Sequence, residues 1–138
     1  MDQLVFLKLG GSLITRKEKA HTPRHYVLRN AAAQICRALL ENSGLQLIIG
    51  HGSGSFGHFP AVQHQTRLGV RTAEEWLGFV EVWKEARSLN TIVMNTLLEQ
   101  DIAAISFPPN AQVTTDNGKI TRWNTDPLNS ALQCGLVP

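Results

Sequence analysis

The feature that most constrains the fold is a glycine-rich octet that directly follows a short apolar segment. The octet spans residues 51–58 with the sequence HGSGSFGH, and the apolar segment 45–50 before it reads LQLIIG. Glycine lets the backbone approach a ligand closely and adopt dihedral angles that other residues avoid. Successive N–H groups in such a loop form an anion-binding concavity, and a helix that starts there adds its positive end. The octet therefore predicts a strand, loop and helix junction that binds phosphate.

A second glycine loop follows the first apolar segment of the chain. Residues 4–9 read LVFLKL, a nearly continuous apolar run typical of a covered parallel strand, and they continue into Gly10, Gly11 and Ser12. A helix is predicted from Pro23 to about residue 42, which completes a right-handed βαβ unit. Ligands of such sheets lie beyond the carboxyl ends of the strands. We therefore expect the two glycine loops to form one phosphate-handling site.

The remaining pattern alternates between helices and strands, which predicts an α/β fold with a mainly parallel sheet and helices on both faces. Residues 12–23 are polar and are expected to be irregular. Further predicted elements are a short helix at 54–65, a long helix at 73–100 that opens on a capping box from Thr72 to Glu75, a strand at 102–106, a β-hairpin near 112–123 that turns at Asn117-Gly118, and a helix at 126–134 with Asp126 as N-cap.

Length and composition narrow the class of protein. The chain has 138 residues and a formal net charge of +2, with 43% hydrophobic and 17% charged residues. Dispersed basic residues indicate no nucleic-acid partner, and the absence of a long apolar run indicates no membrane partner. The first residues lack the basic flank of a signal peptide, so we expect a cytoplasmic protein. Cys36 and Cys134 are interpreted as buried free thiols within helices, and no metal-ligand spacing occurs.

Two lysines are candidates for contact with phosphate. Lys8 stands in an apolar strand just before Gly10-Gly11, where an unpaired ammonium would be costly to desolvate. Phosphate oxygens would remove that cost, and the alternative is a side chain that reaches water from the strand end. Lys17 lies in the charged run TRKEK at 15–19, which composition alone favours as a solvated loop.

The histidines differ in their prospects. His58 closes the octet beside the proposed anion site and could donate to a phosphate, whereas the alternative is a surface histidine on the first helical turn. His51 opens the octet and is interpreted as structural. His21, His25 and His64 show no ligand-like partner pattern and are interpreted as surface residues.

Aromatic residues concentrate on the long predicted helix. Trp76, Phe79 and Trp83 lie there, and Phe56 lies in the octet. Core packing is the simpler interpretation. The alternative is an apolar slot for a hydrocarbon tail beside the phosphate site.

The segments LKLGGS at 7–12 with Lys17, and GHGSGSFGH at 50–58, resemble the isopentenyl phosphate kinases of the amino acid kinase superfamily. The first loop is shared widely across that superfamily. The octet that ends in histidine resembles a smaller group, the isopentenyl phosphate kinases and the related fosfomycin kinases. The resemblance covers the whole chain and implies an amino acid kinase-like αβα sandwich. It also implies that the γ-phosphate of ATP is transferred to isopentenyl phosphate, with Mg²⁺ bridging phosphates.

Carried over by position, the resemblance assigns roles to individual residues. Lys8 and Lys17 would contact the transferring and ATP phosphates, and His58 would hold the acceptor phosphate. The glycine loops and the aromatic residues would complete the site: Gly10, Gly11, Ser12, Gly52, Ser53 and Gly54 for ATP and phosphate, and Gly54, Gly57, His58, Trp76, Phe79 and Trp83 for the substrate.

The chain departs from the family pattern where it stops, at residues 135–138. Family members continue into another strand and a nucleotide-binding half that seats the adenine. We therefore expect residues 1–138 to be the amino-terminal, acceptor-binding part of a truncated fold. The resemblance also implies that the complete enzyme is a homodimer. The alternatives are a fosfomycin kinase-like enzyme for small phosphonates and phosphates, and a non-catalytic phosphate-binding fragment.

Overall fold

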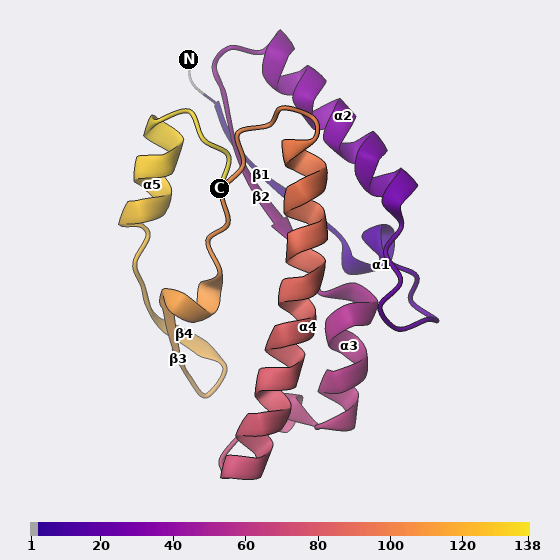
Figure 1. Ribbon diagram of the computed structural model, residues 1–138. Coiled ribbons are helices and arrows are strands. Elements are labelled where there is room, and N and C mark those ends of the chain that lie inside the picture. Colours follow the sequence, from indigo (N-terminus) through magenta and orange to yellow (C-terminus); the bar gives the residue numbers. More distant parts are fainter. Residues whose placement is uncertain (1–2) are drawn as a thin grey trace.

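The computed structural model describes residues 3–138, and Figure 1 shows how the elements follow one another. Two parallel strands, several helices and one antiparallel hairpin make up the chain. The elements are β1 (Gln3–Leu9), α1 (Gly11–Ile14), α2 (His25–Glu41), β2 (Leu45–His51), α3 (Gly54–Gln63), α4 (Ala73–Leu98), β3 (Val113–Asp116), β4 (Lys119–Trp123) and α5 (Asp126–Gln133), with 3-10 turns at Thr66–Leu68 and Pro109–Ala111.

β1 and β2 are paired in parallel, with Leu7 opposite Ile49 and Lys8 opposite Gly50. The helix α2 connects them, so the predicted βαβ unit is confirmed. Because parallel neighbours end at the same edge of a sheet, the loops after Leu9 and His51 leave the strands together. This edge is where the sequence places the candidate site.

The predicted strand at 102–106 is wrong as a strand, although the segment does extend the sheet. Ala104 forms a single parallel bridge with Val137, in which Ile105 N–H donates to Val137 O and Val137 N–H donates to Ala103 O. Ile49 N–H donates to Pro138 O, which places the last residues between β2 and Ala104. Within residues 3–138 the pairing is limited to this one bridge, because Val137 bonds toward Ala103 and Ile105 whereas Pro138 O faces β2.

The hydrophobic core lies on one face of the β1–β2 pair. Leu9, on that face, is only 6% exposed and packs with residues of α2 and α4. Side chains alternate along a strand, so Leu4 and Phe6 point to the other face, and they are 45% and 74% exposed. Within residues 3–138, β1 has β2 as its only strand neighbour and therefore presents a free edge.

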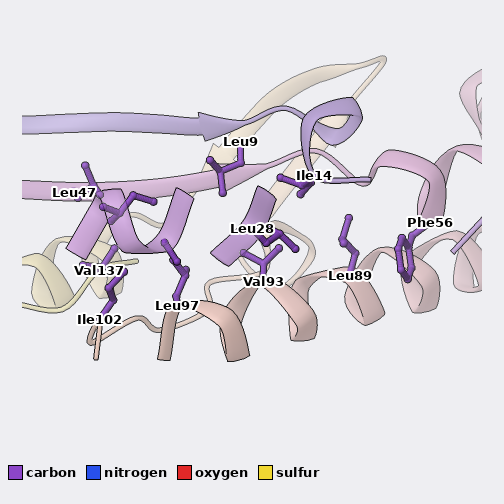
Figure 2. Packing of buried hydrophobic residues seen from close by; sticks show 12 residues of the cluster. Leu9, Ile14, Leu28, Leu47, Phe56, Leu89, Val93, Leu97, Ile102 and Val137 are labelled. Carbon is purple, nitrogen blue, oxygen red and sulfur yellow. The ribbon is translucent and has the colours of Figure 1, made fainter. Parts of the chain in front are cut away.

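The core continues from the strands to the glycine loops. Figure 2 shows Val137 at one end, Leu28 and Val93 in the middle, and Leu89 and Phe56 at the other end. Leu28 comes from α2 and Leu89 and Val93 from α4, so these two helices fix the strands against α3. The beginning of α3 is therefore anchored by packing rather than held as a free loop.

The ends of several elements follow their local sequence. The capping box of α4 is confirmed, since Glu75 N–H donates to Thr72 Oγ1 at 3.2 Å and Thr72 N–H donates to the Glu75 carboxylate at 2.9 Å. The hairpin β3–β4 is also confirmed, and Asn117 and Gly118 at its turn both have positive φ. The N-cap of α5 is Thr125, one residue before the predicted Asp126.

Other expectations about local structure were wrong. Residues 12–23 are not wholly irregular, because α1 covers Gly11–Ile14. The next helix starts at His25 rather than Pro23, since Pro23 forms a bridge with Thr15. Cys36 is half-buried and Cys134 is exposed at the C-cap of α5, so the prediction of a buried thiol fails for Cys134. None of the helices within residues 3–138 is both long and apolar enough to cross a membrane.

Candidate phosphate site

The two glycine loops pack backbone against backbone. A Cβ at Gly11 would lie 2.6 Å from Gly54 N and 2.8 Å from its Cα, and a Cβ at Gly52 would lie 2.9 Å from Gly11 N. Gly54 has a φ of 51°, in the left-handed region that other residues rarely adopt. The structure thus brings the two loops into one unit, as expected from their positions at the ends of neighbouring strands.

Backbone N–H groups at this contact lack acceptors within residues 3–138. They belong to both loops: Gly10, Gly11 and Ser12 from the first, and Ser53 and Gly54 from the second. Several of these residues stand in the first turns of α1 and α3, where a helix offers its N–H groups no internal acceptor. Unpaired amides in a glycine-rich loop are donors for anions. The site is therefore suited to phosphate oxygens.

A buried hydroxyl pair joins the loops, and sequence reasoning missed it. Thr15 is fully buried; its Oγ1 donates to Gly11 O at 2.7 Å and accepts from Ser55 N–H at 2.9 Å. Ser55 is 2% exposed, and its Oγ accepts from Thr22 N–H at 3.4 Å. The sequence did offer one signal for this pair: both residues are small, carry a hydroxyl group and lie close to the glycines. Such hydroxyl groups can form hydrogen bonds with backbone groups that are not paired in a strand.

Lys8 lies near the end of β1, opposite Gly50 and two residues before the first loop. Its side chain is exposed. The position meets both interpretations of this lysine, because an ammonium at the strand end can reach water or an anion held by the loop amides.

Lys17 lies in a loop whose base is closed. Arg16 N–H donates to Thr22 O at 2.9 Å, and Thr15 bridges Pro23 next to it. Lys17 is exposed within the turn between these anchors. Because Thr15 also bonds both glycine loops, the Lys17 loop starts directly at the candidate site.

Two histidines that were interpreted as simple surface residues have carboxylate partners. His21 Nε2 lies 3.0 Å from Glu85 Oε2, and His64 Nε2 lies 2.6 Å from Glu81 Oε2. Both glutamates belong to α4, so each pair ties a preceding segment to this helix. His25 is exposed at the start of α2, as expected.

His58 is exposed on α3, and its ring meets Phe59 edge-on at a centroid distance of 6.1 Å. It stands in the second turn of the helix rather than the first, five positions into α3. Gly57, by contrast, is buried, and a Cβ there would lie 2.5 Å from Ser53 Oγ. Gly57 therefore provides close packing under the loop, whereas His58 is free to meet a ligand.

The aromatic residues of α4 do not fill the core. Trp76, Phe79 and Trp83 are 50%, 39% and 37% exposed, so their interpretation as core residues was wrong. The helix faces α3 with Gly78 instead, where a Cβ would lie 2.6 Å from the His64 ring. Trp76 and Phe79 pack edge to face at 5.3 Å. The three aromatic residues thus present a solvent-facing apolar surface.

His51 supports the interpretation as a structural residue through a polar network. Its Nδ1 lies 3.1 Å from Gly52 O, and its Nε2 lies 3.1 Å from Asn90 Nδ2, an arrangement that suits a proton on Nδ1. Ser106 Oγ donates to Asn90 Oδ1 at 3.0 Å. The network ties the start of the octet to α4 and to the segment after Ala104. Sequence reasoning did not find Asn90 or Ser106.

The side chains that the structure describes at the site do not form a metal-binding cluster. Residues 3–138 contain no group of three or more His, Cys, Asp or Glu side chains that could hold a metal ion. The loop amides and the lysine ammonium are donors, which suit phosphate oxygens and do not bind a cation. A magnesium ion at this edge would therefore be held by phosphate oxygens rather than by these residues.

Comparison with known proteins identifies the family. A model of the amino acid kinase family matches residues 3–138. The chain belongs to the amino acid kinase family. The α/β fold class and the resemblance drawn from the glycine loops are confirmed.

The individual relatives and solved structures belong to one group within this family. The chain is 31% identical to the isopentenyl phosphate kinase of Methanothermobacter thermautotrophicus and 29% identical to that of Methanocaldococcus jannaschii, over 98% of its own length. It superimposes on an X-ray structure of isopentenyl phosphate kinase with a TM-score of 0.88 at 32% identity. A product complex of the Thermoplasma acidophilum enzyme gives a TM-score of 0.82 at 28% identity.

The match covers only part of these relatives. The chain spans 51% and 54% of the two archaeal kinases, and 55% and 53% of the two structures. It therefore spans about half the length of the proteins that it matches.

Proposed function

We propose that residues 1–138 form the amino-terminal, acceptor-binding part of a kinase that transfers the γ-phosphate of ATP to isopentenyl phosphate, giving isopentenyl diphosphate. The observation that carries the proposal is the contact between two glycine loops with unpaired amides. The relatives at about 30% identity are named isopentenyl phosphate kinases, and one solved relative is a complex with substrate. The unpaired amides of the two loops would donate hydrogen bonds to the phosphate of such an acceptor.

Each residue then has a definite task. The amides of Gly10, Gly11 and Ser12 and those of Ser53 and Gly54 hold phosphate oxygens, whereas Gly52 N–H donates to Leu9 O at 3.1 Å. Lys8 and Lys17 neutralise charge as the phosphoryl group moves between two anions. His58 donates to the acceptor phosphate. Phosphoryl transfer depends mainly on positioning and charge neutralisation, so a site made of donors and two ammonium groups suits the reaction.

The aromatic surface of α4 fits the apolar part of the acceptor. Trp76, Phe79 and Trp83 present apolar area to solvent, which costs free energy unless a ligand or another chain segment covers it. A five-carbon hydrocarbon tail would be covered there, whereas a small polar phosphonate would gain little. This surface is the reason to favour isopentenyl phosphate over fosfomycin.

ATP and Mg²⁺ complete the proposed reaction. When bound to the phosphates, Mg²⁺ would offset their negative charge. The role of residues 1–138 is to hold and align phosphates with the two loops, while the adenine is held by a carboxy-terminal half of the family fold. We further expect the complete kinase to be a cytoplasmic homodimer that acts in isoprenoid biosynthesis.

The test is calorimetric titration of the 138-residue chain with isopentenyl phosphate, inorganic phosphate and fosfomycin. We expect saturable binding of isopentenyl phosphate that is tighter than binding of inorganic phosphate, because only the former has a tail. Preference for fosfomycin would move the assignment to the phosphonate kinases. Absence of binding by all three ligands to a folded chain would refute the proposal.

Turnover is tested separately with the chain joined to the carboxy-terminal half of the Methanothermobacter relative, in the presence of ATP and Mg²⁺. His58→Ala should lower acceptor turnover by about 10- to 150-fold, the worth of one charge-assisted hydrogen bond. His25→Ala, at the start of α2, is the matched control and should leave turnover unchanged. Acceptor binding by the chain without any turnover of the joined protein would favour a non-catalytic phosphate-binding module.

A further inference from the structure

We propose that Thr15 is the positioning residue that turns the two glycine loops into one anion site, an inference that rests on the proposed function. The Thr15 side chain is not itself proposed to contact phosphate; it contacts Gly11 and Gly54, which are. Its hydroxyl bonds one loop as donor and the other as acceptor, across 40 residues of sequence to Ser55. It therefore sets how the amides of one loop lie relative to those of the other.

The Thr15 hydroxyl group acts as a donor in one hydrogen bond and as an acceptor in the other. Thr15 Oγ1 donates its single proton to Gly11 O at 2.7 Å, so its lone pairs remain for Ser55 N–H at 2.9 Å. The residue is 0% exposed, so water does not compete for either partner. Both partners on the loops are backbone groups, so one side chain links the backbone of the first loop to that of the second.

The bond to Ser55 also sorts the loop amides into two sets. Ser55 N–H is occupied by Thr15, whereas the N–H groups of Ser53 and Gly54 just before it have no acceptor within residues 3–138. The Ser55 amide, which is bonded to Thr15, therefore separates the unpaired amides of the loop from the buried part of α3. Loss of the hydroxyl would release this amide, while Gly11 O would keep only its bond from the Thr15 backbone N–H at 2.9 Å.

Gly54 shows that the loop is built around the Thr15 side chain. A Cβ at Gly54 would collide with Thr15 Oγ1 and would lie 2.7 Å from its Cγ2. The same Cβ would lie 2.8 Å from Gly11 O. The space that a side chain at Gly54 would need is therefore occupied by Thr15. This is a second reason for glycine at this position, in addition to its positive φ.

The experiment compares three substitutions at Thr15 with one control elsewhere. Thr15→Val keeps the shape and removes the hydroxyl, Thr15→Ser keeps the hydroxyl, and Thr15→Ala removes the hydroxyl without placing a methyl group against Gly11 O. Thr96→Val is the matched control, because Thr96 is also buried and its hydroxyl donates to Ile92 O at 2.8 Å on α4, away from the loops.

Binding of isopentenyl phosphate and inorganic phosphate to each 138-residue chain is measured by calorimetry, and stability by thermal melting. Thr15→Val and Thr15→Ala should bind both ligands about tenfold more weakly, as expected for two lost hydrogen bonds. Thr15→Ser should restore affinity to within about twofold of the unsubstituted chain. Thr96→Val should lose stability without losing affinity, which separates positioning from a general loss of structure.

Amide hydrogen exchange at Ser55 gives a second readout that needs no ligand. It should be faster in Thr15→Val and Thr15→Ala than in Thr15→Ser and Thr96→Val. Unchanged affinity and unchanged Ser55 exchange in a folded Thr15→Ala chain would overturn the role of Thr15. If the unsubstituted chain binds neither phosphate ligand, the proposed function fails, and with it the anion role of Thr15, whatever exchange at Ser55 shows.

Discussion

Replacement of Gly11 by alanine is the sharpest test of the contact between the loops. The added methyl group would lie 2.6 Å from Gly54 N and 2.8 Å from Gly54 Cα. Both are backbone atoms, so no side chain can rotate away to make room. The loops must therefore move apart, or the structure around them must distort.

The size of the effect follows from these distances. Ordinary van der Waals contact begins at 3.4 Å, and the methyl group stands at 2.6 Å, so the loops must separate by about 0.8 Å. Overpacking of this kind costs about 1–3 kcal/mol of the free energy of unfolding. For a chain of this length that corresponds to a melting temperature lower by about 4 to 12 °C. The displaced amides should also weaken phosphate binding.

The assay is thermal melting followed by circular dichroism, with calorimetric titration of isopentenyl phosphate on the same samples. Gly50→Ala is the control, because a Cβ at Gly50 meets nothing within 4 Å although the residue lies near the end of β2, just before the second loop. It should change the free energy of unfolding by less than about 0.5 kcal/mol. If Gly11→Ala melts and binds like Gly50→Ala, the close contact of the two loops is refuted.

Three further predictions concern other parts of the chain. Hydrogen bonds from the backbone N–H of Thr72, and then of Arg71, hold the pKa of Glu75 below its ordinary value. Ionised Glu75 therefore stabilises α4 at pH values above its unfolded-state pKa, and this contribution is lost as pH falls through the folded-state pKa. By circular dichroism, Glu75→Gln should be less helical than the unsubstituted chain at neutral pH and equally helical in strong acid. We expect the chain to self-associate through β1, whose Phe6 is 74% exposed on a strand that has one free edge within residues 3–138; Phe6→Lys should then reduce association in sedimentation velocity, and unchanged association would contradict a role for that face. Asn90→Ala should lower the free energy of unfolding by about 1 kcal/mol through loss of its hydrogen bonds, and a melting temperature equal to that of the unsubstituted chain would show that this network does not stabilise the fold.

The backbone plan could be predicted because it depends on local patterns. The apolar segments that end in glycines gave both strands, and Thr72 with Glu75 gave the start of α4, since the periodicity and the capping residues act over a few positions. The strand expected at 102–106 failed for the opposite reason. Whether Ala104 lies in a ladder depends on a partner 33 positions later, at Val137, and no local pattern contains that information.

The candidate site was predicted in its backbone part and missed in its supporting side chains. The glycines of both loops were found because their lack of a side chain is visible in the sequence. Thr15, Ser55 and Asn90 were not found, because a buried hydroxyl or amide is recognised only when its distant partner is known. Trp83 and its aromatic neighbours were misjudged because helical spacing does not reveal which apolar face a neighbouring element covers.

The central claim is that amides of the two loops bind the acceptor phosphate together, and one measurement tests it directly. The chain is labelled with ¹⁵N-glycine and titrated with isopentenyl phosphate while the glycine amide signals are followed by NMR. The signals of Gly10, Gly11 and Gly54 should shift together and saturate with one dissociation constant. Signals of Gly69, Gly118 and Gly135, which lie outside both loops, should stay fixed. If the loop signals do not move, or if only one loop responds, the account of a single two-loop phosphate site is contradicted.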